Sequence, residues 1–255
     1  MNERDSQSRP SIDGRVVVIT GASRGLGKAL AMRFADHGAS LGLIARNKAK
    51  LSEVAGSLAT PAVAMACDVT DKRQVDRAFQ AIKNKLGSID VVVANAGGQV
   101  AARRADELPI EKWREMIDLN LTGAYIAAQS AYSYLCKSDF RRLVFVSSSA
   151  AKSPASNMCA YAAAKAGMEG LVRALAVDWA PDGICVNALS AGLIENSGAN
   201  SMPNIVTDQV VKRTLLKRAG KVREMTDAAL FLAGAWSSYT TGHVLTVDGG
   251  FGLGW

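Results

Sequence analysis

The sequence predicts an α/β fold, in which helices cover both faces of one doubly wound parallel sheet of about seven strands. Short apolar runs, most of them rich in Val and Ile, alternate with longer segments of helical period. Strands that are covered on both faces have this composition, and the alternation of strand and helix is typical of a parallel sheet. The predicted strands are Val16–Thr20, Ser40–Ala45, Ala62–Cys67, Val91–Ala94, Leu143–Ser147, Ile184–Leu189 and Val244–Val247. The predicted helices are 26–37, 47–58, 71–86, 110–137, 157–180 and 222–235.

The chain is predicted to form a single domain over residues 12–255. A chain of 255 residues lies within the range of undivided α/β domains, and no repeat or linker divides it. Residues 1–11 are polar and lack the apolar core of a signal peptide, so we expect a flexible tail. Residues 193–221 interrupt the strand–helix rhythm after the sixth strand, where such a sheet exposes its ligand crevice. A substrate lid is predicted there, and a tolerated surface insertion is the alternative.

The composition argues against several classes of protein. No apolar run approaches the ~20 residues of a membrane span. Four scattered cysteines without a Cys-x-x-Cys motif, and only two histidines, predict reduced thiols, a cytoplasmic location and no metal site. The net charge of +7 is spread along the chain without a DNA-binding motif. It therefore predicts a surface that favours anionic ligands, and no nucleic-acid partner.

A glycine-rich turn follows the first predicted strand and opens the first helix. Its glycines are spaced Gly-x-x-x-Gly-x-Gly. Glycines at such a turn let the backbone approach a pyrophosphate that lies against the helix N-terminus. The sequence therefore predicts a dinucleotide site, and a tight turn without a ligand is the alternative. The predicted cofactor contacts in this turn are Gly21, Ser23, Arg24, Gly25, Leu26 and Gly27.

The end of the second predicted strand favours NADP(H) over NAD(H). An NAD site usually places a carboxylate here, whereas an arginine accommodates the 2′-phosphate of NADP. The sequence has Arg46 at this point and no acidic residue between Asp36 and Glu53. A guanidinium can bind a phosphate bidentately. The alternative is that Arg46 only occupies the start of a helix.

The third and fourth predicted strands end in further candidate cofactor contacts. Asp68, followed by Val69, can accept a hydrogen bond from an adenine amine. Asn95, Ala96 and Gly97 follow the fourth strand, where small residues let a cofactor lie close. Either segment alone would be an ordinary turn.

Tyr161 and Lys165 are the candidate catalytic pair. Residues four apart on a helix lie one turn apart on the same face. A cation one turn away favours the phenolate and lowers the pKa of a phenol from its ordinary value of about 10. The pair therefore indicates proton exchange near neutral pH.

With these motifs in order, the chain resembles the short-chain dehydrogenase/reductase family from about residue 12 to its end. The resemblance implies a single Rossmann-type domain in which Tyr161 exchanges a proton with a substrate oxygen. Lys165 is implied to lower the pKa of that tyrosine and to bind the nicotinamide ribose. Two more positions match, Ser148, implied to orient the substrate carbonyl, and Asn120, implied to hold a water.

Some positions leave alternatives open or depart from the family pattern. Ser147 and Ser149 are alternatives to Ser148, and on a strand both point to the opposite face. Where the family has Pro-Gly and then Thr, this chain has Ala191-Gly192 and Asn196. The Gly192 and Ile194 backbone is implied to meet the cofactor carboxamide, with Asn196 in place of the threonine. Loss of the proline is expected to loosen this turn.

The resemblance leaves two substrate classes open. Similar proteins include 3-oxoacyl carrier-protein reductases, which dock an acidic carrier through arginines that follow the fourth helix and the catalytic helix. The corresponding positions here hold Asp139 and Asp182, which would repel such a carrier. Three arginines lie nearby and could compensate, namely Arg141, Arg142 and Arg173.

We therefore expect NADP-dependent interconversion of a ketone and a secondary alcohol on a free small molecule. A 3-oxoacyl carrier-protein reductase is the alternative. A non-catalytic cofactor-sensing protein is a third interpretation, which the loss of Tyr161 or Lys165 would have indicated. We also expect a homotetramer, as is common in the family. The residues predicted to line the substrate pocket are Gln99, Val100, Ser149, Asn157, Cys159 and Leu193.

Overall fold

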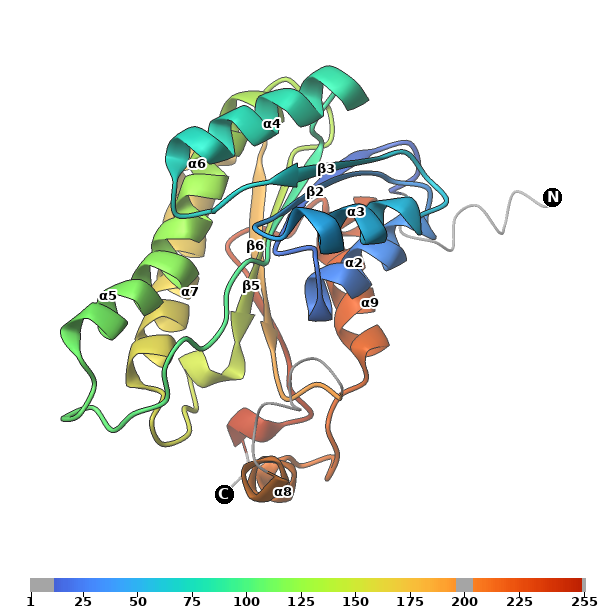
Figure 1. Ribbon diagram of the computed structural model, residues 1–255. Coiled ribbons are helices and arrows are strands. Elements are labelled where there is room, and N and C mark those ends of the chain that lie inside the picture. The colour runs from blue at the N-terminus through green and yellow to red at the C-terminus, as the bar shows by residue number, and fades with distance from the viewer. Residues whose placement is uncertain (1–11, 196–203, 254–255) are drawn as a thin grey trace.

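The computed structural model describes residues 12–195 and 204–253, and these form seven parallel strands with helices on both faces (Figure 1). The strand order is β3-β2-β1-β4-β5-β6-β7. The strands are β1 (Val16–Thr20), β2 (Ser40–Ala45), β3 (Ala62–Ala66), β4 (Val91–Ala94), β5 (Arg142–Ser148), β6 (Cys185–Ala191) and β7 (Val244–Val247). The predicted α/β fold with a doubly wound parallel sheet is confirmed. The tail predicted over residues 1–11 lies outside the described residues.

Two hydrophobic layers fill the spaces between the sheet and its helices. One layer joins the sheet to α2 (Gly25–Ala35), α3 (Lys48–Gly56) and α9 (Val222–Ala233). The other joins the opposite face to α4 (Lys72–Leu86), α6 (Gly123–Leu135) and α7 (Cys159–Trp179). Two further helices are α5 (Ile110–Ile117) and α8 (Asn204–Arg213). Every strand contributes fully or partly buried apolar residues to both layers, because successive side chains point to opposite faces.

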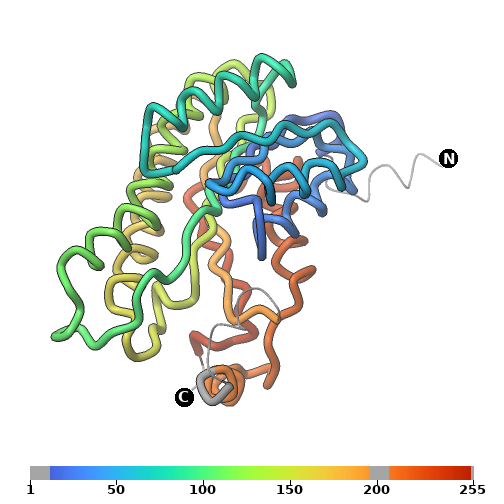
Figure 2. The backbone as a smooth tube through the Cα atoms, viewed as in Figure 1, coloured from blue at the N-terminus to red at the C-terminus, as the bar shows by residue number. Residues whose placement is uncertain are grey.

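Segments far apart in the sequence meet on one side of the sheet. Figure 2 shows α2, in the blue part of the chain, beside the orange-red α9. An ion pair of 2.6 Å between Arg33 of α2 and Asp227 of α9 joins the two helices. The N-terminal and C-terminal parts of the chain are therefore packed into one layer.

The strand order places a crevice at the carboxyl ends of β1 and β4. The chain runs outward from β1 to β2 and β3, then returns to β4 on the other side of β1. Connections leave in opposite directions at this point, and ligands of open α/β sheets bind there. The glycine turn, the end of β4 and the candidate catalytic pair all belong to this edge of the sheet.

One sequence prediction about helices is wrong, and one helix was not predicted. Residues 110–137 do not form one helix, because a π-helical turn, η1 (Asp118–Thr122), separates α5 from α6. The side chain of Asn120 donates to the Met116 carbonyl, which the backbone N–H of Asn120 would otherwise use in an α-helix. The helix that was not predicted is α8, which lies in the segment 193–221. Apolar residues recur at helical spacing there, but they follow a stretch of loop-forming residues.

None of the helices in the described ranges is long and apolar enough to cross a membrane. Short 3-10 helices complete the connections, namely η2 (Ser149–Ala151), η3 (Ala180–Asp182), η5 (Ala235–Ser237) and η6 (Phe251–Leu253). The strands and the remaining helices agree with the predicted ranges to within a few residues at most ends, which is the usual scatter of element boundaries.

Candidate active site

The glycine turn between β1 and α2 has no room for side chains. Gly21 and Gly25 have positive φ angles of 69° and 54°, a conformation that glycine adopts without strain. A Cβ atom on Gly27 would lie 2.2 Å from the Gly21 carbonyl oxygen. The turn and the first turn of α2 can therefore pack this closely only because these positions are glycine. Ser23 and Leu26 lie partly buried between them.

The end of β4 is tied to the end of β1 by hydrogen bonds. The Asn95 side chain donates to the Thr20 carbonyl at 2.9 Å. The Thr20 hydroxyl accepts from the backbone N–H groups of Asn95 (3.0 Å) and Ala96 (2.9 Å). The structure thus turns the Asn95 side chain toward β1, where it fixes the floor of the crevice.

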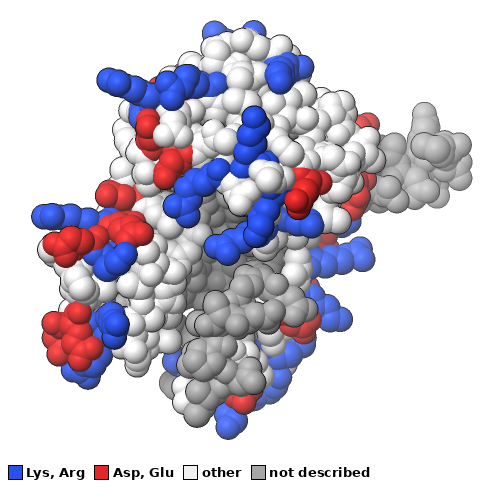
Figure 3. All heavy atoms as spheres, viewed as in Figure 1, with Lys and Arg blue, Asp and Glu red and all other residues white. Residues whose placement is uncertain are grey.

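Arg46 follows the last residue of β2 and is exposed, as is Arg24 at the start of α2. Within the described part of the chain, neither guanidinium is in an ion pair. Figure 3 shows Lys and Arg side chains gathered over α2 and α3 on this face of the molecule. Both arginines are therefore free to meet an anionic group at the crevice edge.

The remaining predicted cofactor contacts lie at the ends of β3 and β6. Asp68 is partly buried and accepts from the Thr70 N–H at 3.0 Å and the Thr70 hydroxyl at 2.8 Å. The buried Val69 packs under α6, where a Cβ atom on Gly123 would lie 2.9 Å from its side chain.

The turn after β6 is supported by hydrogen bonds although it lacks the proline that the family has at this point. Gly192 donates to the Val247 carbonyl at 2.9 Å, and Ile194 bridges to Gly220. Asn196 lies outside the described residues.

Tyr161 and Ser148 meet between the first turn of α7 and the end of β5. Burial raises the pKa of the Tyr161 phenol above its ordinary value, and a hydrogen bond with the Ser148 side chain opposes this rise. The net direction is the opposite of that expected from the Tyr161–Lys165 spacing. The reason is that desolvation disfavours the phenolate more than the serine favours it.

Lys165 is buried, with 3% of its surface exposed. Its Nζ donates to the Val146 carbonyl of β5 at 2.8 Å and lies 5.7 Å from the centre of the Tyr161 ring. Burial lowers the pKa of this ammonium from 10.5 to about 8. Lys165 is thus held beside the phenol ring and can exchange a proton near neutral pH.

Asn120 lies fully buried at the centre of the π-helical turn. Its side-chain oxygen accepts from the Gly98 N–H at 2.9 Å, and its amide donates to the Gly98 carbonyl at 2.9 Å. A Cβ atom on Gly97 would lie 2.6 Å from that oxygen and 3.4 Å from Lys165 Nζ. The segment after β4, Asn120 and Lys165 are therefore brought together.

The three serines after Val146 have different surroundings. The Ser147 hydroxyl points to α7 and donates to the Glu169 carboxylate at 3.0 Å. Ser148 ends β5, and its hydroxyl accepts from the Ala150 N–H at 3.2 Å. The prediction assumed that Ser149 lies on the strand. Ser149 lies instead in η2, because the chain turns there. Sequence reasoning missed Glu169, although a charged residue on an apolar helix face, four residues after Lys165, was a usable signal.

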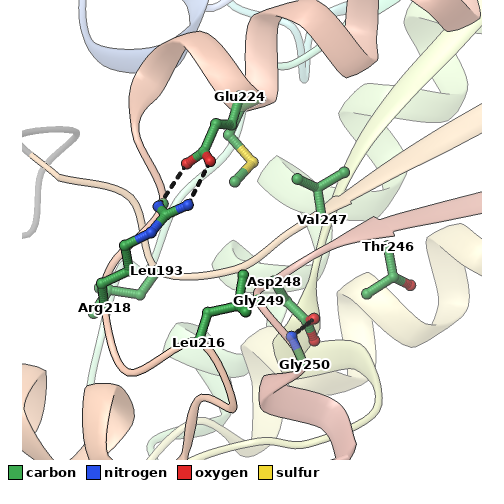
Figure 4. A pocket seen from close by; sticks show the side chains of 11 residues that line it. Leu193, Leu216, Arg218, Glu224, Thr246, Val247, Asp248, Gly249 and Gly250 are labelled. Atoms are coloured by element: carbon green, nitrogen blue, oxygen red, sulfur yellow. Dashed lines mark hydrogen bonds and ion pairs between the residues drawn. The ribbon is translucent and has the colours of Figure 1, made fainter.

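The predicted substrate residues fall into two groups. Gln99 donates to the Asn157 carbonyl at 3.3 Å, which joins the loop after β4 to the loop before α7. Cys159 is partly buried in the first turn of α7, close in sequence to Tyr161. Leu193 instead lines a pocket of about 290 Å³ at the carboxyl ends of β6 and β7 (Figure 4). Figure 4 shows the Arg218–Glu224 ion pair on one wall of this pocket and Asp248 on the other.

No three metal-ligating side chains come together within the described ranges. The candidate site brings together the glycine turn, the buried Asn120 and Lys165, and the Ser148–Tyr161 contact.

Comparisons with known proteins agree with this geometry. A family model described as enoyl-(acyl carrier protein) reductase matches residues 21–252. The 3-oxoacyl-(acyl-carrier-protein) reductase MabA of Mycobacterium tuberculosis is 32% identical over 249 residues, which cover 97% of this chain and 96% of that protein.

Two solved structures are also similar. Levodione reductase superposes with a TM-score of 0.91 at 27% identity, covering 95% of this chain and 99% of the other. The 3-ketoacyl-(acyl-carrier-protein) reductase of Brucella melitensis, solved in complex with NADH, has a TM-score of 0.89 at 30% identity. It covers 95% of this chain and 100% of the other. The similar proteins thus include both carrier-protein reductases and a reductase named for a small ketone.

Proposed function

The chain belongs to the short-chain dehydrogenase/reductase family, and we propose that it interconverts a ketone and a secondary alcohol on a free small molecule, with NADP(H) as cofactor. The observation that carries this proposal is the arrangement of Ser148, Tyr161 and Lys165 at the carboxyl end of β5. A hydroxyl, a phenol and a buried amine meet there beside the crevice where this fold binds ligands.

The crevice fits a dinucleotide. Side chains are excluded at Gly21, Gly27 and Gly97, where an added Cβ atom would collide with neighbouring groups. These glycines let the turn, the end of β4 and Asn120 pack closely around the crevice, and the N-terminus of α2 favours negative charge. When bound, a nicotinamide dinucleotide supplies or accepts the hydride that side chains cannot transfer.

Tyr161 is the proton donor in the direction of reduction. Its raised pKa keeps the phenol protonated at neutral pH, so the proton is on Oη when a carbonyl oxygen arrives. The Ser148 hydroxyl, held beside the phenol, orients and polarises the same oxygen. Alcohol oxidation requires the phenolate and so becomes more favourable as the pH rises.

Lys165 Nζ is the group that restores the proton. With a pKa of about 8, it can both release and take up a proton near neutral pH. Lys165 Nζ is held by its hydrogen bond to the Val146 carbonyl, and Gly97 and Asn120 lie close to it. We assign Asn120 to this path through its position next to Lys165.

The preference for NADP(H) rests on Arg46 and Arg24. Both are exposed at the edge of the crevice, and neither is in an ion pair within the described residues. The sequence has no acidic residue between Asp36 and Glu53 to bind the ribose of NAD or to repel a 2′-phosphate. The relative from Brucella melitensis was solved with NADH. The proposed preference for NADP(H) is therefore argued from the residues of this chain and not from that relative.

Internal contacts at the carrier-docking positions support a free substrate. Asp139 is paired with Arg15, and Asp182 accepts from the Tyr132 phenol at 2.9 Å. Arg141, which could have compensated for these acids, donates inward to the Ser138 and Asp182 carbonyls at 2.6 and 2.8 Å. Arg142 is buried, and only Arg173 remains exposed. Two acids at the docking positions and a single exposed arginine suit an acidic carrier poorly, which counts against a 3-oxoacyl carrier-protein reductase.

We infer a cytoplasmic location from the cysteines. All four are free in the structure. Burial raises the pKa of the Cys67 thiol to about 11, which makes it unreactive. Free thiols are typical of proteins from a reducing compartment.

The test is NADPH oxidation with three probes, namely levodione, acetoacetyl-coenzyme A, and the same acetoacetyl group on an acyl carrier protein. We expect turnover of a free ketone, and a loss of about 100- to 10,000-fold in kcat for Tyr161→Phe with NADPH binding retained. NADPH binding without turnover of any ketone would favour the cofactor-sensing interpretation. The alternative function, a 3-oxoacyl carrier-protein reductase, is supported by the similarity to MabA. If it is correct, kcat/KM should be at least about tenfold higher for the carrier-linked thioester than for acetoacetyl-coenzyme A.

A further inference from the structure

A buried carboxylate lies on the catalytic helix, one turn beyond Lys165. Glu169 is only 5% exposed. Carboxylates are rarely buried to this degree unless they are paired, because removing a charge from water is costly. Within the described residues Glu169 has no ion pair. It is also about 12 Å along the helix from Tyr161, too far to contact the reacting atoms.

The partner of Glu169 is the serine that precedes Ser148. Ser147 Oγ donates to Glu169 Oε1 at 3.0 Å, and both side chains are buried. A hydrogen bond from a hydroxyl to a carboxylate is charge-assisted, and therefore stronger than one between neutral groups. We call this contact the Ser147–Glu169 clamp.

The clamp is one of three contacts that fasten α7 to the end of β5. Ser148 meets Tyr161, the Val146 carbonyl meets Lys165, and Ser147 meets Glu169. The three helix residues are spaced by four and so lie on one face of α7. Three consecutive residues of the strand are thus held by three consecutive turns of the helix.

This end of β5 needs such support because it has lost one neighbouring strand. β4 pairs with β5 only as far as Phe145, opposite Ala94. Beyond that point, Val146, Ser147 and Ser148 are paired with β6 alone. The position of Ser148 relative to Tyr161 therefore depends on contacts with α7.

We propose that Glu169 is a positioning residue of the reaction, which acts through Ser147 to hold Ser148 against Tyr161. This inference rests on the proposed function. The carboxylate touches neither cofactor nor substrate, and its effect on the reaction is carried by the strand end. A purely structural role would lower stability without a selective effect on kcat.

The test compares five variants with the wild type, namely Ser147→Ala, Glu169→Leu, the double variant, Glu169→Gln and the control Ser190→Ala. Ser190 is the register partner of Ser147 on β6, is fully buried, and has a hydroxyl without a partner in the described structure. The control therefore removes a buried serine hydroxyl at the same level of the sheet without breaking the clamp. The measurements are kcat and KM with levodione or acetoacetyl-coenzyme A, the Kd for NADPH, and urea unfolding.

We expect Ser147→Ala and Glu169→Leu each to lower kcat by about 10- to 100-fold, because small misplacements of catalytic groups have effects of this size. The Kd for NADPH should change by less than about twofold, and the double variant should lose no more than the larger single loss. Glu169→Gln keeps an acceptor for Ser147 and should retain most of the activity. Losses that multiply in the double variant, or an equal loss of kcat in Ser190→Ala, would overturn the proposal.

Crystal structures of the wild type, Ser147→Ala and Ser190→Ala separate this inference from the proposed function. If the wild type reduces no ketone, the proposed function fails, but the position of Ser148 can still be compared. The clamp predicts that Ser148 Oγ moves away from Tyr161 by more than about 0.5 Å in Ser147→Ala and stays in place in Ser190→Ala. An unmoved Ser148 in both variants would contradict it.

Discussion

Lys165 holds a titratable amine where water is excluded, and this gives its proton a measurable effect on stability. Its pKa falls from 10.5 in the unfolded chain to about 8 in the folded protein because of burial. Between these values the unfolded chain binds more protons than the folded protein. Stability from this residue therefore increases as the pH rises through the window from about 8 to 10.5, and the cost of a buried charge is fully present below it.

The variant Lys165→Met removes this titration. Relative to the variant, the wild type should gain up to about 3 kcal/mol in the free energy of unfolding between pH 8 and pH 10.5, since a shift of one pKa unit corresponds to about 1.4 kcal/mol. Urea unfolding of both proteins across this range measures the difference, and the other titrating groups are common to both. A difference that does not change with pH would show that the folded pKa is not lowered.

Arg46 carries the prediction of cofactor preference. Arg46→Ala should raise the KM for NADPH by about 10- to 100-fold and leave the KM for NADH unchanged, because only NADPH has the 2′-phosphate. Lys83→Ala, an exposed position on α4, is the control for loss of one positive charge. Equal effects of the two variants would mean that net charge, and not a specific contact, determines the preference.

At the residue scale, the sequence predicted those site residues that belong to a motif with a recognisable spacing. The Tyr161–Lys165 pair and the glycine turn are patterns of this kind. The pKa of Tyr161 could not be predicted, because it depends on how deeply the fold buries the phenol. Glu169 was missed because its partner, Ser147, is far away in the sequence and only the packing of α7 on β5 brings the two together.

At the scale of elements, the closest contact in the cofactor crevice is the one between the glycine turn and α2. Gly27→Ala should destabilise the protein by about 1–3 kcal/mol, because its Cβ atom would collide with the Gly21 carbonyl at 2.2 Å. Gly56→Ala is a matched control at the end of another helix, where a Cβ atom would meet nothing within 4 Å. There we expect no loss, or a gain of up to about 1 kcal/mol. Urea unfolding measures both, and equal losses would contradict the packing argument.

Strands were predicted well because buried parallel strands are short runs of Val and Ile. The helical region 110–137 was read as one element because its apolar period continues across the break. The π-helical turn depends on a side-chain contact of Asn120 with Met116 and Gly98 that no periodicity records. The helix α8 was missed because the residues before it are typical of loops.

At the scale of the whole molecule, the two hydrophobic layers share their strands. Val16, Val18, Val92 and Phe145 belong to one layer, and Val17, Val91 and Val144 to the other. Loss of either layer therefore exposes the sheet that supports the second, and we expect one cooperative unfolding transition. Tryptophan fluorescence and far-ultraviolet circular dichroism should give coincident urea curves. Two separated transitions would contradict a single domain over residues 12–255.

The expected homotetramer is a second prediction at this scale. Large apolar side chains are exposed at Val177 (76%) and Leu253 (75%), and they suit burial against neighbouring subunits. Light scattering should give about four times the chain mass of 26.8 kDa. A mass equal to that of one chain would leave these side chains in water and would exclude the tetramer at the concentration measured.

The contact between Gly192 and the strand β7 also bears on how the protein is made. Gly192 donates to the Val247 carbonyl, and its Cα faces Asp248 so closely that a Cβ atom would lie 2.6 Å from the backbone there. β7 comes last of the described strands in the chain. Tyr161 and Lys165 leave the ribosome long before the residues that hold the Gly192 turn. A nascent chain therefore carries its candidate catalytic pair before it can form the contact that supports the Gly192 turn.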